Sequence, residues 1–238
     1  MAGRQTHIHL TTQAKDFWLA RGAVLFIVAL QLGLVNDLTV GPHWLAPVIE
    51  LALLIPLSVA TAWTQRHARK ASTESDWKRV GRNRRLMRGF AIPLTAIVTL
   101  MNFGALARLM AAILSGRAGN GQTLLLDSAN IWLTNIVVFA LWFWALDRGS
   151  PAIKGMVRDP QNDFFFPQQQ SVRDWPPFAK WSPGFVDYLF LAFTNSTAFS
   201  PADTFPLTAR AKLLMMAEAI ISLVTIALVA SRAVGILS

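Results

Sequence analysis

Cysteine is absent from this chain of 238 residues, tyrosine occurs once, and charged residues make up only 15% of it. Without cysteine there is no disulfide, no thiolate-bound iron–sulfur cluster and no thiol nucleophile. So little charge beside 53% hydrophobic residues excludes an ordinary soluble domain. Several apolar runs approach or exceed the length of a membrane-spanning helix, and they do not alternate as strands of a β-barrel would. We therefore expect an all-α, polytopic membrane protein.

Acidic residues are also scarce, since 13 Asp and Glu stand against 22 Lys and Arg. A positive balance can indicate nucleic-acid binding, but here the basic residues lie beside apolar runs, where they orient membrane helices. The densest cluster is a predicted loop over residues 64–88. It holds nine basic residues against two acidic ones: Arg66, Arg69, Lys70, Lys78, Arg79, Arg82, Arg84, Arg85 and Arg88. We expect this loop and the N-terminus to be cytoplasmic, with the lipid bilayer and not nucleic acid as partner; binding of anionic lipids is an alternative role for the loop.

Apolar runs divide the chain into three parts. Residues 1–146 form a four-helix transmembrane region that includes the basic loop, residues 147–182 a polar or interfacial connector, and residues 183–238 a pore-loop-like module. The predicted spans are residues 17–35, 44–63, 89–114, 124–146 and 213–237. A further apolar run over residues 185–199 is short, and it predicts either a re-entrant helix or a short sixth span. The fold is therefore about five transmembrane helices plus this short one.

Three ionisable residues interrupt apolar runs: Glu50, Arg108 and Glu218. Such residues are costly inside a membrane and indicate either a functional site or a charge pair. Arg108 could pair with Glu50 or Glu218, or it could reach the outer interface, and the sequence leaves these alternatives open.

Small polar residues end the short apolar run, and a Pro-containing turn follows them. Hydroxyl and amide oxygens can replace part of the hydration shell of an ion, and rings of acidic residues concentrate cations in symmetric oligomers. The predicted ion path is Asn195, Ser196, Thr197, Ala198, Phe199, Ser200, Asp203 and Glu218. The alternatives are helix–helix contacts for the small polar residues and capping of the following helix for the aspartate.

The turn and the last apolar run resemble the pore module of bacterial two-helix potassium channels. Asp203 is followed three residues later by Pro206, and the stretches 218–221 and 227–232 continue the likeness. The resemblance implies a pore helix, a selectivity filter, an inner helix and a homotetramer in the bacterial inner membrane. Ser200 and Ala202 stand where the filter would carry glycines, so strict potassium selectivity is not implied. The layout of the whole chain is also similar to that of bacterial integral-membrane proteins of unassigned function.

Motifs of catalysis are missing, since the chain contains no Gly-rich phosphate loop, no HExxH and no Gly-x-Ser-x-Gly. We therefore expect no enzyme, no catalytic residue, no metal site and no cofactor. The predicted function is an oligomeric ion channel that passes inorganic ions. One alternative is an ion- or proton-coupled transporter that uses Glu50, Arg108 and Glu218. The other is a non-conducting membrane scaffold or accessory subunit.

Overall fold

A computed structural model of the chain describes residues 18–32, 44–45, 47–52, 55, 74–116, 121–147, 162–170, 181, 183–198 and 204–237. In residues 74–91, 170, 198 and 232–237 it describes the backbone alone. Most of the predicted second span, residues 44–63, lies outside the described residues.

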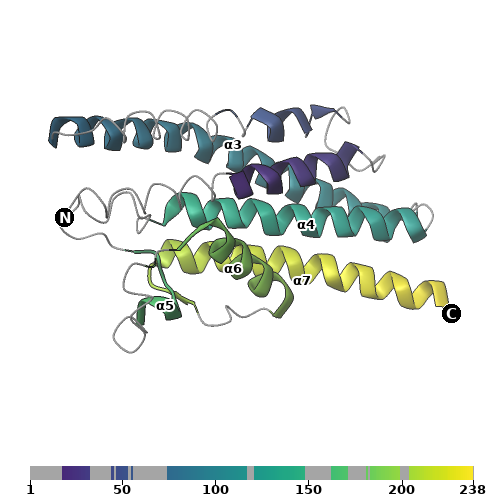
Figure 1. Ribbon diagram of the computed structural model, residues 1–238. Helices are drawn as coiled ribbons and strands as arrows, with labels where there is room; N and C mark the ends of the chain where they lie inside the picture. Colours follow the sequence, from purple (N-terminus) through teal and green to yellow (C-terminus); the bar gives the residue numbers. More distant parts are fainter. Residues whose placement is uncertain are drawn as a thin grey trace.

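Helices dominate the described chain, which confirms the all-α prediction (Figure 1). Three of them are long and apolar enough to cross a membrane, over residues 92–114, 121–146 and 209–231. A shorter apolar helix occupies the predicted first span. In chain order the elements are this helix, Trp18–Leu32, then α3 (Glu74–Leu114), α4 (Gly121–Leu146), β1 (Phe164–Phe165), α5 (Pro167–Gln170), α6 (Phe185–Ala198), β2 (Phe205–Pro206) and α7 (Ala209–Leu237).

Helix α4 is the centre of the bundle and contacts α3, α6 and α7. In Figure 1 it lies between α3 on one side and the α6–α7 pair on the other. Of its membrane-length stretch 67% is buried, against 22% in the corresponding stretches of α3 and α7. A membrane helix covered by protein in this way can carry polar side chains, because they face other helices rather than lipid.

Polar side chains join α3 to α4. Trp142 Nε1 donates a hydrogen bond to Thr99 Oγ1 at 2.9 Å, and Asn102 Nδ2 donates to the carbonyl oxygen of Ile131 at 3.1 Å. These bonds satisfy donors that would otherwise be buried in apolar surroundings.

Helix α3 corrects the predicted loop over residues 64–88. From Glu74 onward the basic stretch is helical, and it continues without a break through Pro93 into the apolar span. Eight of the eighteen residues between Glu74 and Pro93 are Arg, Lys, Leu or Met, whose long unbranched or γ-branched side chains favour helix. The helix ends at Leu114, after which Gly116 takes a left-handed conformation with φ 68° and donates its N–H to the carbonyl oxygen of Ile113 at 3.2 Å.

Helix α6 enters the bundle and does not cross it. Its first turn lies where α4 ends, because the Tyr188 hydroxyl donates to Asp147 at 2.5 Å. The chain after α6 is back at this same end, because Phe205 of β2 pairs with Phe165 of β1. The 14 residues of α6 measure about 21 Å, short of the about 30 Å of hydrocarbon in a bilayer. Within the bundle, α6 therefore follows the course expected of the re-entrant alternative.

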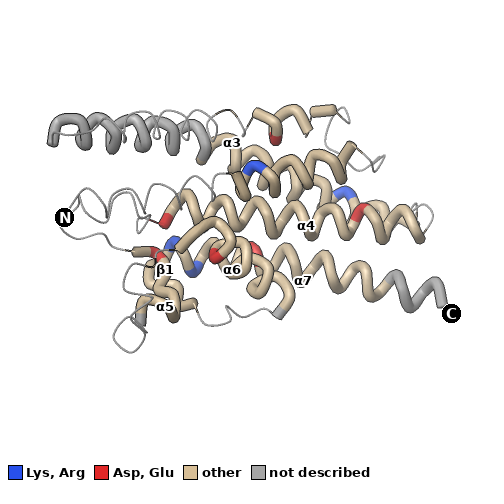
Figure 2. Tube along the Cα trace, in the orientation of Figure 1, with Lys and Arg blue, Asp and Glu red and all other residues tan. Residues whose placement is uncertain are grey.

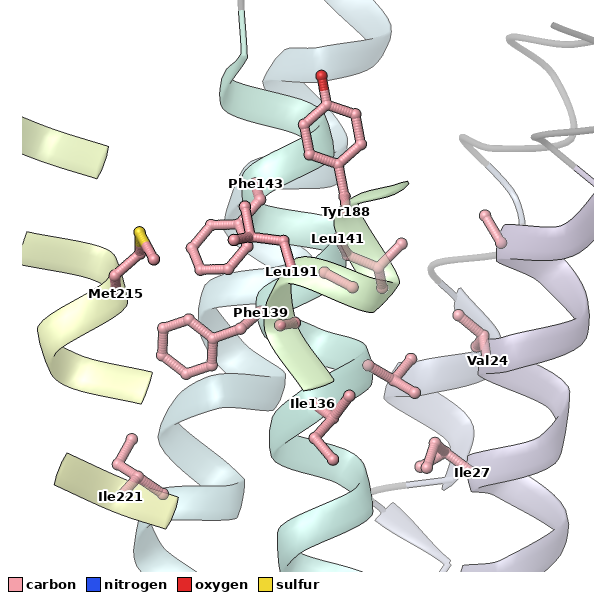
Figure 3. Packing of buried hydrophobic residues seen from close by; sticks show 14 of the residues in the cluster. Val24, Ile27, Ile136, Phe139, Leu141, Phe143, Tyr188, Leu191, Met215 and Ile221 are labelled. Atoms are coloured by element: carbon pink, nitrogen blue, oxygen red, sulfur yellow. The ribbon is translucent and has the colours of Figure 1, made fainter. Parts of the chain in front are cut away.

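Apolar side chains hold α6 against its neighbours. Tyr188 and Leu191 on α6 belong to one buried cluster with Phe139 and Phe143 of α4 and Met215 of α7. Figure 3 shows the Leu191 side chain beside the aromatic rings of α4. This packing fixes the depth at which the polar residues of the last turns of α6 lie.

Candidate functional site

Glu218 lies inside the bundle, on the face of α7 that is turned toward α4 and α6. Its side chain is 0% exposed. Asn195, near the end of α6, donates from Nδ2 to Glu218 Oε2 at 2.7 Å and to the carbonyl oxygen of Met215 at 2.9 Å. The re-entrant helix is therefore tied to the spanning helix through the carboxylate itself.

Two more polar residues complete this group from α4 and α7. Asn135 donates from Nδ2 to Ser222 Oγ at 2.9 Å and to the backbone carbonyl oxygen of Glu218 at 3.3 Å. We call Asn135, Asn195, Glu218 and Ser222 the Glu218 group. All four side chains are buried, and three different helices supply them.

One oxygen of the Glu218 group is left without a partner. Glu218 Oε1 is buried and accepts no hydrogen bond from any described residue. The partner of the carboxylate among these residues is the neutral amide of Asn195, so no positive side chain compensates it there. A buried carboxylate oxygen that lacks a donor is unfavourable by about 1–3 kcal/mol or more, and such a group requires an explanation. A bound proton, metal cation or water would satisfy it.

The end of α6 adds a negative potential beside this group. The last carbonyl groups of a helix carry a partial negative charge, which favours cations. Ser196 and Thr197 lie in this last turn, and both hydroxyls donate back to the carbonyl oxygen of Phe193, at 3.0 and 2.8 Å. Their oxygens keep accepting capacity, and Ser196 is buried whereas Thr197 is exposed.

A second polar network lies at the end of the bundle where α4 ends, and we call it the end layer: Asp147, Asp163, Tyr188, Thr208 and Arg210. Asp147 accepts the Tyr188 hydroxyl on Oδ2 at 2.5 Å and the Asp163 backbone N–H on Oδ1 at 2.9 Å. Figure 2 shows acidic and basic residues gathered around β1 and the start of α6, at this end.

Asp163 is the most connected residue of the end layer. It accepts from Thr208 Oγ1 at 2.6 Å and from Arg210 Nε at 2.6 Å, both on Oδ1, and it forms an ion pair with Arg210 Nη2 through Oδ2. Arg210 Nη2 also reaches the carbonyl oxygen of Leu146, the last residue of α4, at 3.4 Å. The network therefore joins β1, the end of α4 and the start of α7.

Aromatic residues of the connector pack beneath the end layer. The Phe164 ring lies 5.1 Å from the Phe143 ring, and the Phe166 ring lies 5.4 Å from Tyr188 and 5.7 Å from Trp181. The sequence predicts an irregular or interfacial connector over residues 147–182. Its described part instead includes β1, α5 and two buried phenylalanine side chains, because burial of aromatic area against the helices outweighs exposure at a surface.

Of the predicted ion path, the structure brings Asn195 and Glu218 together and places Ser196 in the same buried region. Thr197 lies on the outside of α6, and only the backbone of Ala198 is described. Phe199, Ser200 and Asp203 are outside the described residues.

The predicted intramembrane pair of Glu50 and Arg108 is not formed. The Glu50 carboxylate accepts its hydrogen bond from Gln31 Nε2 at 2.7 Å, and its other oxygen has no partner among the described residues. Arg108 lies in α3 with an exposed side chain. Glu50 and Glu218 belong to two separate hydrogen-bonded groups, so one carrier site formed by all three ionisable residues is not present.

Sequence reasoning missed Gln31, the partner of Glu50. It also missed Asn135 and Ser222, which complete the Glu218 group beside the predicted Asn195. It also missed Asp147 and Asp163. Polar side chains inside apolar runs were a usable signal for Gln31, Asn135 and Ser222, because membrane helices turn such side chains toward other helices. Over the described chain no three His, Cys, Asp or Glu residues gather as a metal centre would require.

Comparisons with known protein families, with curated proteins and with solved structures found no match to this chain.

Proposed function

We propose that this protein conducts inorganic cations across a membrane, with the Glu218 group and the end of α6 as the cation-attracting site. The observation that carries the proposal is the buried Glu218 Oε1, a carboxylate oxygen without a donor among the described residues. It lies on a helix long enough to span a membrane. Ionisable groups in such positions characterise ion and proton paths.

The re-entrant geometry of α6 supports a channel-like path. A helix that stops part-way through a membrane directs its carbonyl end at the interior, where the partial negative charge lowers the energy of a cation. Asn195, in the last turn of this helix, donates a hydrogen bond directly to the Glu218 carboxylate.

An exposed face of α6 and α7 supports assembly of several copies. It carries large apolar side chains from both helices, at Val186, Phe190, Phe193, Leu213, Met216 and Ile220. Glu218 is buried within one protomer, which speaks against a ring of Glu218 side chains around a shared axis. In the assembly that we propose, a homotetramer by resemblance to two-helix channels, the exposed Thr197 faces the axis and Glu218 acts from behind it.

In the orientation that we propose, the end of the bundle at which α6 begins lies on the cytoplasmic side of the inner membrane. The basic first part of α3, from Glu74 to Arg88, projects at the end where α6 enters (Figure 1). Basic segments next to spans remain in the cytoplasm. The pore loop is then inverted relative to potassium channels, and Ser238 follows a helix that leaves toward the other side.

The test is cation flux through purified protein in proteoliposomes, with planar-bilayer recording of the same sample under asymmetric KCl and then NaCl. We expect discrete current steps with a reversal potential that indicates cations. Glu218→Gln should lower the flux at least tenfold, because it removes the charge and keeps the shape. Glu74→Gln, the same change at the first residue of α3, should leave the flux unaltered.

Silent wild-type protein that is folded and oligomeric would refute conduction and favour a scaffold or accessory subunit. Wild-type flux in Glu218→Gln would remove Glu218 from the path.

A carrier is the second candidate, and the burial of Glu218 inside one protomer favours it. In a carrier the carboxylate exchanges a proton for another cation without an open pore. A carrier would give slow, saturable flux that is coupled to a proton gradient and shows no current steps. This result would replace the channel proposal with the carrier.

A further inference from the structure

A second buried carboxylate lies away from the Glu218 group. Glu50 is 3% exposed, and Gln31 Nε2 donates to its Oε1 at 2.7 Å. The second carboxylate oxygen of Glu50, Oε2, and the amide oxygen of Gln31, Oε1, are both buried. Neither has a hydrogen-bond partner in the described chain. The Gln31–Glu50 hydrogen bond holds the two side chains together, so these two unpartnered oxygens lie on the two groups that it joins.

The packing around Glu50 places this pair within the apolar bundle. Ile49, the residue before Glu50, packs with Val98 of α3 and Val138 of α4. The Trp18–Leu32 helix, which carries Gln31, contributes Ile27 and other residues to the main buried cluster. The pair therefore belongs to the side of the bundle formed by the Trp18–Leu32 helix and α3, and it has no contact with Asn195 or Glu218.

Both unpartnered atoms are acceptors, which limits what can occupy the site. An amide oxygen and a carboxylate oxygen are hard ligands, suited to alkali cations or to a proton and unsuited to anions. Glu50 has no basic partner among the described residues, so one positive charge would balance the carboxylate. An ionised carboxylate without such compensation is very costly in apolar surroundings.

We propose that Gln31 and Glu50 form a second monovalent-cation site, at which a proton and an alkali cation compete for the Glu50 carboxylate. A bound alkali cation is held by Glu50 Oε2 and Gln31 Oε1, and the Gln31 amide keeps the carboxylate oriented through Oε1. When the proton occupies the site, Glu50 is a neutral acid beside the Gln31 amide.

The experiment uses N,N′-dicyclohexylcarbodiimide, an apolar reagent that modifies protonated carboxyl groups. Full-length wild-type protein in detergent is treated with and without NaCl, LiCl or KCl, at several pH values. Mass spectrometry of the peptides then reports Glu50 and Glu218 separately. We expect modification of Glu50 that decreases as pH rises and that saturating Na⁺ or Li⁺ slows at least tenfold. Protection by an alkali cation identifies that cation as a ligand. A response to pH with no protection by any of the three salts would overturn the cation site.

A matched variant tests the role of the amide oxygen. Gln31→Leu should keep the Glu50 modification and lose the protection by alkali cations, and its tryptophan fluorescence should show a folded protein. Glu50 that stays unmodified at every pH, or that is modified at a rate insensitive to pH and to all three salts, would overturn the proposal. The wild-type measurement decides this even if the variant does not fold. Because Glu50 and Glu218 are read on different peptides, this result is independent of the conduction proposed for Glu218.

Discussion

The end layer and the Glu218 group are both polar networks around buried carboxylates, but they differ in how completely their acceptors are satisfied. In the end layer Asp163 bonds Thr208 and Arg210, and its carboxylate is paired with a cation. In the Glu218 group the carboxylate has an amide partner on one oxygen and no partner among the described residues on the other. Gln31 and Glu50 repeat this second arrangement.

The difference separates two uses of a buried charge. A carboxylate with all its acceptors filled and a positive partner holds elements together, and breaking such a pair is strongly unfavourable. A carboxylate with an empty acceptor position does little for stability, and its persistence is more readily explained by a ligand that comes and goes. The predictions below test this contrast by stability alone.

The largest loss of stability is expected for Asp163→Ala. The change removes the acceptor of Thr208 and Arg210 and leaves their donors unpaired at the end of the bundle. We expect a loss of about 3 kcal/mol in the free energy of unfolding, because Asp163 is a buried acceptor of hydrogen bonds from two side chains, one of them charged and partly exposed. Titration with sodium dodecyl sulfate in mixed micelles, followed by tryptophan fluorescence, measures it. Asp163→Asn should restore part of the loss, and a loss below about 1 kcal/mol for Asp163→Ala would contradict a stabilising role for the end layer.

An intermediate loss, with a characteristic pH dependence, is expected at Tyr188. Burial raises the pKa of its hydroxyl well above the ordinary value, and the negative charge of Asp147 raises this pKa further. Tyr188→Phe removes a hydrogen bond to a charged group, which corresponds to about 2 kcal/mol.

The sign of the pH effect follows from the raised pKa. The unfolded chain loses the Tyr188 proton near about pH 10, whereas the folded chain keeps it. The stability from this hydroxyl is therefore complete below about pH 10 and decreases as the pH rises further. Because Tyr188 is the only tyrosine, tyrosinate absorbance in an alkaline titration reports on it alone. Tyrosinate that forms near about pH 10 in folded protein would contradict the buried hydrogen bond.

The smallest change is expected for Glu218→Gln. The glutamine oxygen can still accept from Asn195, and a buried charge is removed, so the free energy of unfolding should change by less than about 1 kcal/mol. The same micelle titration measures it beside Asp163→Ala. A loss as large as that of Asp163→Ala would make the Glu218 group a structural network and weaken the functional interpretation.

Particular elements show how far the sequence leads. The spans that became α4 and α7 were predicted because runs of apolar residues of membrane length are a local property. The short run over residues 185–199 was recognised, but its re-entrant course depends on the pairing of β1 with β2, which joins Phe165 and Phe205. The basic stretch that forms the start of α3 was assigned to a loop, because clusters of positive charge indicate the cytoplasmic side of a membrane protein. Such charge does not by itself interrupt a helix.

The candidate sites follow the same division. Glu50 and Glu218 were singled out because an acidic residue within an apolar run is conspicuous in the sequence. The pairings of these carboxylates were not predicted, because Gln31 lies 19 positions from Glu50 and Asn195, although part of the predicted ion path, lies 23 positions from Glu218. A pairing across such distances depends on how helices pack rather than on spacing along one helix.

By itself the sequence determined that the protein is helical and that several apolar runs, among them those of α3, α4 and α7, have the length and apolarity to cross a membrane. It also determined that an acidic residue, Glu218, interrupts the run of α7. These properties follow from transfer of side chains between water and hydrocarbon, which each residue contributes locally. Only the tertiary structure decided that α6 turns back, that Asp163 is paired with Arg210 and that Glu218 keeps an oxygen without a described partner. The reason is that hydrogen bonds and ion pairs require atoms within about 3 Å, and only the packed chain brings such atoms together.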